Sequence, residues 1–234
     1  MDDRQARDVL FAGATGLVGG LALPALLERA AAEGFRVFAL VRRPLALTHP
    51  NLHPIQAGLD DAAGLADVAQ QLRRADAHPQ VFVCALGTTL RQAGSAAAFA
   101  AIDRDLVVAL AQLARAQGAT QALVVSSVGA RAGSGNLYLR VKGEMEAAVE
   151  ALGFNRVDFL HPGLLLGQRS GPTRPGEGIA QALAPWFNPL LIGPLRQYGA
   201  ISAGAVATAV VALCGKAGSG VNRISNRQIQ ALAD

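Results

Sequence analysis

The architecture of this 234-residue chain follows from Val9-Leu10-Phe11-Ala12-Gly13-Ala14-Thr15-Gly16-Leu17-Val18-Gly19. A short apolar run leads directly into three glycines at intervals of three residues, and an Ala/Leu-rich segment follows them. This order predicts a buried strand, a tight turn and a helix. Gly13 permits the turn, Gly16 lets the backbone approach a pyrophosphate, and Gly19 lets the helix pack closely on the strand. Because the start of a helix attracts phosphate, residues 13–19 predict a nucleotide site rather than an ordinary βα turn.

The same alternation continues along the chain, where short β-rich runs are separated by longer amphipathic Ala/Leu segments. It predicts βαβ units around a parallel sheet. Most runs are almost entirely apolar, as expected for strands with helices on both faces. With right-handed crossovers, the simplest result is a doubly wound α/β sheet, the Rossmann fold, with strand order 3-2-1-4-5-6. The expected strands are Val9–Ala12, Arg36–Val41, His53–Ala57, Val81–Leu86, Ala122–Val125 and Val157–His161, and the expected helices are Leu17–Ala32, Ala62–Arg74, Ala96–Gln117 and Leu137–Leu152.

We expect a single domain over residues 1–234, because the length suits one large domain and no linker interrupts the pattern. Residues 162–200 are rich in glycine and proline and show no clear strand pattern. We expect them to form a loop or lid on the substrate side of the sheet. A helix at Ala203–Cys214, a last strand at Val221–Ser225 and a short terminal helix should follow. The aromatic residues that we expect to form an apolar substrate wall are Trp186, Phe187 and Tyr198.

The charge pattern does not favour a nucleic-acid partner, although the formal net charge is +4. The arginines occur singly or in pairs, with no basic run and no interleaved aromatic residues. No apolar run reaches the ~20 residues that span a bilayer, and the acidic start at Asp2-Asp3 is not that of a secretory signal. We therefore expect a small-molecule substrate, no nucleic-acid or membrane partner, and a cytoplasmic location. The residues whose spacing predicts no metal site are Cys84, Cys214, His49, His53, His78 and His161.

The end of the second expected strand indicates which dinucleotide is bound. Sites specific for NAD usually carry an Asp or Glu there, about 20 residues after the glycines, to bind the ribose 2′-hydroxyl. Here the strand ends Ala39-Leu40-Val41-Arg42-Arg43-Pro44, with two arginines and no acid. A guanidinium can bind a 2′-phosphate through two hydrogen bonds, whereas a carboxylate would repel it. We therefore expect Arg42 and Arg43 to select NADP; NAD is the alternative if both side chains are only solvated.

A second informative segment is Tyr138-Leu139-Arg140-Val141-Lys142. The chain has only two tyrosines and two lysines, and one of each stands four residues apart here. On a helix these two side chains share one face. An ammonium stabilises a neighbouring phenolate, which makes a phenol a better proton donor and acceptor near neutral pH. The preceding strand ends Val124-Val125-Ser126-Ser127, and a serine hydroxyl there can bind a substrate carbonyl or alcohol oxygen beside Tyr138.

Together with the glycine turn, these segments resemble the short-chain dehydrogenase/reductase superfamily, specifically its atypical TIP30-like members. The resemblance covers nearly the whole chain. It implies an NADP-dependent oxidoreductase that transfers a hydride between the cofactor and a small carbonyl or alcohol. The segments that carry it, besides the turn, are Leu86-Gly87-Thr88-Thr89, Ser126–Ala130, Tyr138–Glu146 and Pro162–Gly167.

The resemblance also implies a role for each matching residue. Tyr138 would be the catalytic acid/base, and Lys142 would support it and hold the nicotinamide ribose. Ser127, in preference to Ser126, would orient the substrate oxygen. The remaining residues implied to bind the cofactor are Leu86, Gly87, Thr88, Pro162 and Gly163.

The chain departs from the superfamily pattern at two positions near these residues. Asp103 stands where many members carry Asn, and His161 precedes Pro-Gly where Arg is commoner. Two other functions remain open. One is an NADP-binding redox-sensing or regulatory protein without significant turnover, and the other is a nucleotide-sugar epimerase or dehydratase. The epimerase is disfavoured because only about 70 residues follow the sixth strand, which is short for a substrate domain.

Overall fold

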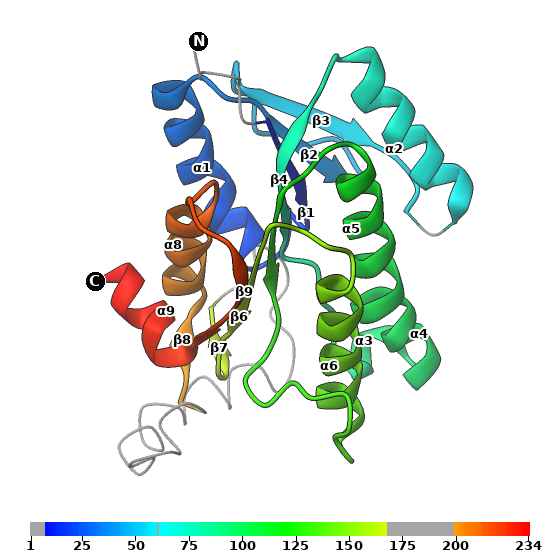
Figure 1. The fold of residues 1–234 in the computed structure, drawn as a ribbon, viewed down its shortest axis with the longest axis vertical. Helices are drawn as coiled ribbons and strands as arrows, with labels where there is room; N and C mark the ends of the chain where they lie inside the picture. Colours follow the sequence, from blue (N-terminus) through cyan, green and yellow to red (C-terminus); the bar gives the residue numbers. More distant parts are fainter. Residues whose placement is uncertain (1–7, 60, 168–198) are drawn as a thin grey trace.

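The computed structural model describes residues 8–59, 61–167 and 199–234. Its main sheet has seven parallel strands in the order β3-β2-β1-β4-β5-β6-β9 (Figure 1). The doubly wound fold and the order of its first six strands are therefore confirmed, and the predicted last strand lies beside β6. The strands are β1 (Asp8–Ala12), β2 (Val37–Val41), β3 (Leu52–Gln56), β4 (Pro79–Cys84), β5 (Gln121–Val125), β6 (Arg156–His161) and β9 (Gly220–Ser225), and a small second sheet pairs β7 (Leu165–Leu166) with β8 (Ile201–Ser202).

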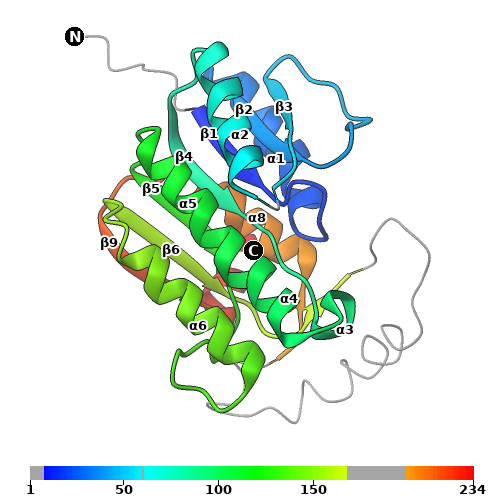
Figure 2. The ribbon, with the colours of Figure 1, turned by 90° about the vertical axis from the view of Figure 1, so that its right-hand side faces the viewer.

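Helices cover both faces of the sheet (Figures 1 and 2). One face carries α1 (Gly19–Glu33), α8 (Ala203–Leu213) and α9 (Asn226–Ala233). The opposite face carries the longer helices α2, α5 and α6, with the short segments α3, α4 and η1 leading into α5. No described helix is both long enough and apolar enough to cross a membrane. The bounds on this second face are α2 (Ala62–Arg74), α3 (Leu90–Ala93), α4 (Ala96–Ala100), η1 (Ala101–Leu106), α5 (Val107–Ala116) and α6 (Leu137–Glu150).

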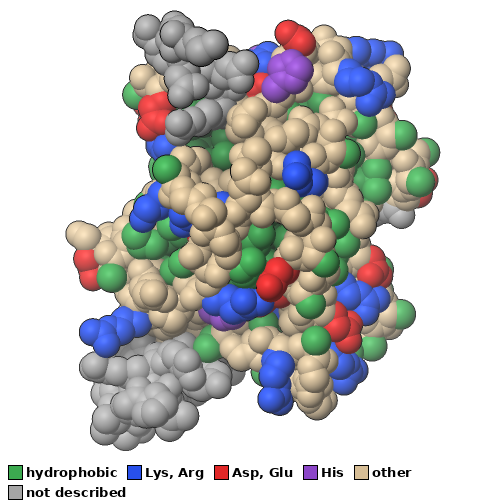
Figure 3. Space-filling model, viewed as in Figure 1, with side chains coloured by type: hydrophobic (Ala, Val, Ile, Leu, Met, Phe, Trp, Pro, Cys, Tyr) green, Lys and Arg blue, Asp and Glu red, His purple; other side chains and the backbone are tan. Residues whose placement is uncertain are grey.

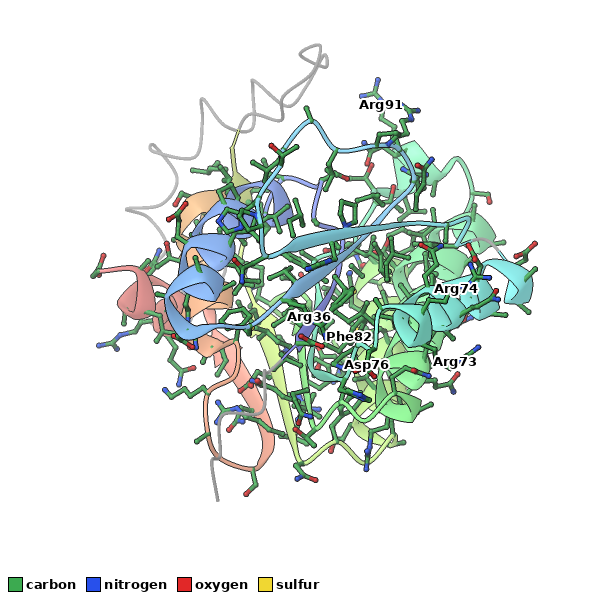
Figure 4. The ribbon with its side chains drawn as sticks, turned by 90° about the horizontal axis from the view of Figure 1, so that it is seen from above. Arg36, Arg73, Arg74, Asp76, Phe82 and Arg91 are labelled. Atoms are coloured by element: carbon green, nitrogen blue, oxygen red, sulfur yellow. The ribbon has the colours of Figure 1, made fainter. Side chains whose placement is uncertain are left out.

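Both faces of the central strands are buried, which explains their unbroken apolar sequences. On β1, Val9 and Phe11 belong to the core under α1 and α8, whereas Leu10 and Ala12 belong to the core under α2, α5 and α6. Side chains alternate between the faces of a strand, so each consecutive residue enters a different core. Phe82 on β4 is fully buried in the second core (Figure 4). Burial of each such side chain contributes roughly 1.5–3 kcal/mol.

An ion pair fixes the sheet edge where β1 begins. The buried Asp8 carboxylate lies 2.6 Å from the Arg36 guanidinium, which also donates to the backbone carbonyls of Ala75 and Asp76. The Asp8 carboxylate further accepts from the backbone N–H of His78. Figure 4 shows Arg36 beside Asp76. These contacts join the starts of β1 and β2 to the end of α2.

Most element boundaries lie within two residues of the sequence-based predictions, and two differences bear on the site. The expected helix Ala96–Gln117 is interrupted by the π-helix η1. A π-helix forms i to i+5 hydrogen bonds and so widens the helix locally. The expected strand Val81–Leu86 lies two residues earlier, at Pro79–Cys84, so Ala85 and Leu86 belong to the following loop. The expected lid over residues 162–200 is described only at 162–167 and 199–200. The proposed aromatic wall, Trp186, Phe187 and Tyr198, lies outside the described residues.

Two adjacent glycines of α1 test how closely this helix packs on the glycine turn. A Cβ atom on Gly19 would overlap the Gly13 carbonyl, whereas a Cβ atom on Gly20 would lie 3.9 Å from its nearest neighbour, the Ala14 carbonyl oxygen. We expect Gly19→Ala to lower the free energy of unfolding by about 1–3 kcal/mol. The matched change Gly20→Ala should raise it by about 0.5–1 kcal/mol, because alanine favours a helix. Urea denaturation of both variants measures the difference, and equal effects would contradict the packing described here.

Candidate active site

The candidate site is a cleft of about 590 Å³ at the carboxyl edge of the sheet. It lies where the strand order reverses between β1 and β4, which is where open α/β sheets bind ligands. The cleft gathers many of the predicted residues but not all of them. Those that line it are Leu17, Val18, Leu86, Gly87, Thr88, Ser127, Tyr138, Lys142 and Gly163; those that do not are Gly13, Ala14, Thr15, Gly16, Gly19, Arg42, Arg43 and Pro162.

The glycine turn lies against the loop after β4. Gly13 has φ +84°, and a Cβ atom there would come within 2.5 Å of the Ala85 carbonyl carbon. The Gly16 N–H donates to the Gly13 carbonyl oxygen at 2.9 Å, and the Ala85 N–H donates to the Ala12 carbonyl oxygen at 2.9 Å. Only glycine fits this close approach of two backbones at a positive φ. The glycine at position 13 is thus required for the turn to lie against the loop after β4.

η1 and α5 continue directly from the helical segment before them and have no side-chain cap. Among the described helices that begin after a loop, α1 differs from the others at its N-terminus. Val18 gives it no side-chain hydrogen bond. Capping side chains accept from the first-turn N–H groups of α2, α3, α4, α6, α8 and α9. First-turn N–H groups have no partner within their own helix, and they bind phosphate readily. At the start of α1, the N–H groups of Gly20 and Leu21 donate to the carbonyl oxygens of Gly16 and Val18. This helix start lies directly after the glycine turn, the place where a Rossmann fold binds a pyrophosphate.

The two predicted selectivity residues follow β2, the strand beside β1. Arg42 and Arg43 are both exposed and lie outside the cleft itself. On the face drawn in Figure 3, basic and acidic side chains are scattered among neutral ones. The pair of arginines is thus placed one strand away from the glycine turn, on the side where the second strand of a dinucleotide fold meets the adenosine ribose.

Helix α6 carries the predicted catalytic pair on one face. The Asn136 side chain caps the helix by accepting from the Leu139 N–H at 3.2 Å. Tyr138 and Lys142 both line the cleft, and the Tyr138 ring packs against Phe99 with a centroid distance of 5.6 Å. A spacing of four residues therefore has the predicted effect, because both side chains reach the same cleft from one helix.

Lys142 is buried and forms an ion pair with Asp103, the residue that stands where many superfamily members carry Asn. Its Nζ lies 2.7 Å from Oδ1 of the fully buried Asp103. The other oxygen, Oδ2, accepts from the Thr88 N–H at 2.9 Å. Asp103 lies on the π-helix η1, a geometry frequent at functional sites. The Asp103 carboxylate, which lines the cleft, thus joins α6 to the loop after β4.

The charge on Lys142 is maintained despite its burial. Burial by itself lowers the pKa of Lys142, but the nearby Asp103 carboxylate and Tyr138 phenol raise it, and the net pKa lies above the ordinary value. The amine is therefore protonated at neutral pH. An ammonium in this position stabilises negative charge on a neighbouring oxygen.

The two adjacent serines after β5 have different environments. The Ser126 hydroxyl is buried and donates to the Glu146 carboxylate. The Ser127 hydroxyl is half-buried and makes one long contact, 3.3 Å, to the Val128 carbonyl oxygen. Both serines line the cleft. Ser127 is therefore the hydroxyl that a substrate oxygen can engage with less competition.

Glu146 is a buried site residue that sequence analysis missed. Besides Ser126, its carboxylate lies 2.8 Å from Nε2 of His161 and 3.3 Å from Nε of Arg223. It therefore connects α6 with the ends of β5, β6 and β9. Its position four residues after Lys142 is the only signal in the sequence, because its partners are far away along the chain.

The segment after β6 approaches the same edge. The Pro162 carbonyl oxygen accepts from the Val128 N–H at 3.0 Å, and the Gly163 N–H donates to Oδ1 of Asn226 at 2.9 Å. Pro162 itself is buried behind the cleft, whereas Gly163 lines it. Of this predicted Pro-Gly pair, only the glycine thus reaches the space where a ligand would bind.

The cysteines contribute to packing. Cys84 and Cys214 are free and buried, and burial raises the pKa of Cys84 to about 11 and that of Cys214 to about 12. Both thiols therefore stay protonated at neutral pH. Across residues 8–59, 61–167 and 199–234, no three His, Cys, Asp or Glu side chains are grouped so as to hold a metal ion.

The fold, the glycine turn and the cleft define a NAD(P)-binding Rossmann protein of the short-chain dehydrogenase/reductase type. A family model described as NAD(P)H-binding matches residues 13–178. The chain belongs to this NAD(P)H-binding family.

Individual relatives confirm the resemblance to TIP30-like proteins. The rat protein HTATIP2 is 37% identical over 177 residues, which cover 76% of this chain and 70% of the rat protein. The protein fmp52 of Emericella nidulans is 34% identical over 224 residues, or 93% of each chain. Among solved structures, a short chain dehydrogenase from Leptospira borgpetersenii with bound NAD+ has the same fold, with TM-score 0.67 and 16% identity over 96% of this chain and 93% of that one.

These relatives correct the expected location. The fmp52 proteins of Emericella nidulans and Saccharomyces cerevisiae are named mitochondrial. The expectation of a cytoplasmic protein, which rested on the lack of a secretory signal and of a membrane span, is therefore wrong. Neither observation bears on targeting to an organelle, because targeting signals are separate from the fold.

The buried ion pair can be tested against an exposed one on the same short helix. We expect Asp103→Asn to lower the free energy of unfolding by about 3–5 kcal/mol, because it leaves the buried Lys142 charge without its partner. The matched control is Asp105→Asn, whose exposed carboxylate pairs with Arg104 at 2.7 Å. The control should cost less than about 1 kcal/mol. Chemical denaturation at pH 7 measures both, and similar losses would mean that the buried pair does not stabilise the fold.

Proposed function

We propose that this protein is an NADP-dependent oxidoreductase that transfers a hydride between NADP(H) and a small carbonyl or alcohol. The observation that carries the proposal is the buried Lys142 ammonium, held 2.7 Å from Asp103 and one helical turn from Tyr138 in the cleft. A cation placed beside a phenol favours proton transfer by that phenol.

Several residues fit the cofactor. The glycine turn and the start of α1 would hold the pyrophosphate, and Arg42 and Arg43 would bind the 2′-phosphate. Leu86, Gly87 and Thr88 would line the nicotinamide half, where Lys142 would hold the ribose. Pro162 would position Gly163 near the carboxamide from behind. When bound, the reduced cofactor supplies the hydride.

The side chains of the cleft would manage the proton and the substrate oxygen. Ser127 would donate a hydrogen bond to the carbonyl oxygen and so polarise the carbonyl. Tyr138 would give its phenolic proton to that oxygen as the carbonyl carbon gains the hydride, so that an alcohol and the oxidised cofactor result. In the reverse direction the phenolate would accept the proton. Lys142 would stabilise that phenolate.

A second candidate function is redox sensing or regulation by bound NADP without significant turnover. The Asp103–Lys142 pair is the observation that favours it. A paired ammonium stabilises a phenolate less than a free one does. The same pair would still hold the ribose in place. The two candidates differ in turnover and agree on cofactor binding.

Removal of the Tyr138 hydroxyl oxygen tests the oxidoreductase against the redox sensor. We expect Tyr138→Phe to lower kcat for carbonyl reduction by about 10²- to 10⁴-fold, because general acid catalysis is lost. The dissociation constant for NADPH should change less than about twofold, since one neutral hydroxyl contributes little to a large ligand. Stopped-flow turnover and fluorescence titration measure the two quantities. Normal turnover in Tyr138→Phe would exclude Tyr138 as the acid/base, whereas NADPH binding by the wild type without turnover of any carbonyl would favour the sensor.

The choice of NADP can be tested at the end of β2. We expect the double variant Arg42→Ala/Arg43→Ala to weaken NADPH binding about tenfold to hundredfold, as loss of charge-assisted hydrogen bonds predicts. NADH binding should change less than about twofold, because NADH has no 2′-phosphate. The control Arg73→Ala/Arg74→Ala removes two exposed arginines at the end of α2 (Figure 4) and should affect neither cofactor. Equal losses for NADPH and NADH in the first variant would remove the case for NADP.

A further inference from the structure

The cleft has two unlike sides. Ser127, Tyr138 and Lys142 bring polar groups to it from β5 and α6. The segment after β6 instead lines the cleft with apolar side chains. These are three consecutive leucines, Leu164–Leu166, which we name the leucine ledge. Leu164 is 51% exposed, one of the few large apolar side chains of the described chain that solvent reaches to this degree. An exposed apolar surface inside a functional cleft marks a place for an apolar ligand.

The leucine ledge is held in place from both sides. The Leu164 carbonyl oxygen accepts from the Ile201 N–H at 2.9 Å, and β7 pairs with β8 in parallel. The buried Asn226 side chain accepts from the Gly163 N–H at 2.9 Å and donates to the Gly199 carbonyl oxygen at 3.1 Å. A surface fixed in this way loses little conformational entropy when a ligand binds.

The charges of the cleft favour a neutral ligand. Among the described residues that line it, the charged side chains are Asp103 and Lys142, and these neutralise each other at 2.7 Å. Among the described residues of the cleft, a carboxylate or diphosphate substrate would meet only a lysine that is already paired, whereas the cofactor's pyrophosphate would lie outside the cleft at the glycine turn. Leu17, Val18 and Leu86 line the part of the cleft that the cofactor would occupy; besides these and the leucine ledge, the apolar lining residues are Ala85, Val125 and Val128.

We propose that the leucine ledge binds the hydrocarbon chain of an uncharged aliphatic aldehyde or ketone, and that Leu164 determines selectivity for chain length. The inference rests on the function proposed above. The carbonyl would lie at Ser127 and Tyr138 while the chain extends along Leu164–Leu166. The carbonyl carbon gains a hydride from the reduced cofactor, its oxygen gains the proton of Tyr138, and the alcohol leaves together with the oxidised cofactor.

Unreactive analogues test binding separately from turnover. Straight-chain primary amides from butanamide to decanamide carry a neutral carbonyl and can be titrated calorimetrically into the protein saturated with NADP+. We expect affinity to rise about three- to fourfold per methylene until the cleft is filled. With NADPH, kcat/KM for the matching aldehydes should rise in parallel. UDP-glucose, a nucleoside-diphosphate sugar, should neither bind in competition with decanamide nor be turned over.

Two leucines of equal exposure provide a matched pair of variants. Leu164→Asp places a charge in the leucine ledge and should reduce the ratio of decanamide to butanamide affinity about tenfold or more. Leu21→Asp changes a leucine of 52% exposure on α1 that does not line the cleft. This control should keep the wild-type ratio. Because both leucines are exposed, neither change removes a core contact.

The outcomes separate the two proposals. Amide affinity that rises with chain length, without turnover of any aldehyde, would support the leucine ledge and count against the oxidoreductase. Turnover that does not depend on chain length, an unchanged ratio in Leu164→Asp, or competitive binding of UDP-glucose would overturn the inference and leave the oxidoreductase standing. Absence of both amide binding and aldehyde turnover would overturn both.

Discussion

The ion pair between Lys142 and Asp103 is the interaction on which the organisation of the cleft depends. It joins α6 to the π-helix η1, and through the Thr88 N–H it also fixes the loop after β4. Neither charge is stable alone in this position, because burial of an unpaired charge is costly. Each therefore requires the other, and together they hold three elements at the carboxyl edge of the sheet. The position of Tyr138 in the cleft follows from this arrangement, since it shares a helix face with Lys142.

The parts of the fold that depend on local sequence were predictable. The alternation of apolar runs with amphipathic segments predicted a parallel sheet, and the spacing of Gly13, Gly16 and Gly19 predicted the turn. Both patterns involve residues close together in the chain. The π-helix was not predicted, since most positions of Ala96–Gln117 are apolar and the shift of one residue that a widened turn introduces does not stand out in such a segment. Glu146 was missed for a related reason: His161 and Arg223, its partners, come from strands that only the folded sheet brings together.

The two faces of the molecule differ in what they contribute. The layer of α1 and α8 presents the glycine turn and an uncapped helix start, which suit a dinucleotide. The layer of α5 and α6 presents the phenol and the ammonium, which suit a proton transfer. The sheet edge between them brings both sets of groups into one cleft. The Leptospira protein shares this fold at 16% identity, and a shared fold does not fix the chemistry of a site.

Asn226 has a consequence for how this architecture can vary among relatives. The residue that fixes Gly163 and Gly199 belongs to the start of α9, beyond the segment 13–178 that matches the NAD(P)H-binding family. The leucines of the ledge, Leu164–Leu166, lie within that segment, whereas a residue that supports them lies near the end of the chain. Exchange of only the C-terminal segment between two relatives would therefore keep these leucines and change the residue that holds their backbone in place.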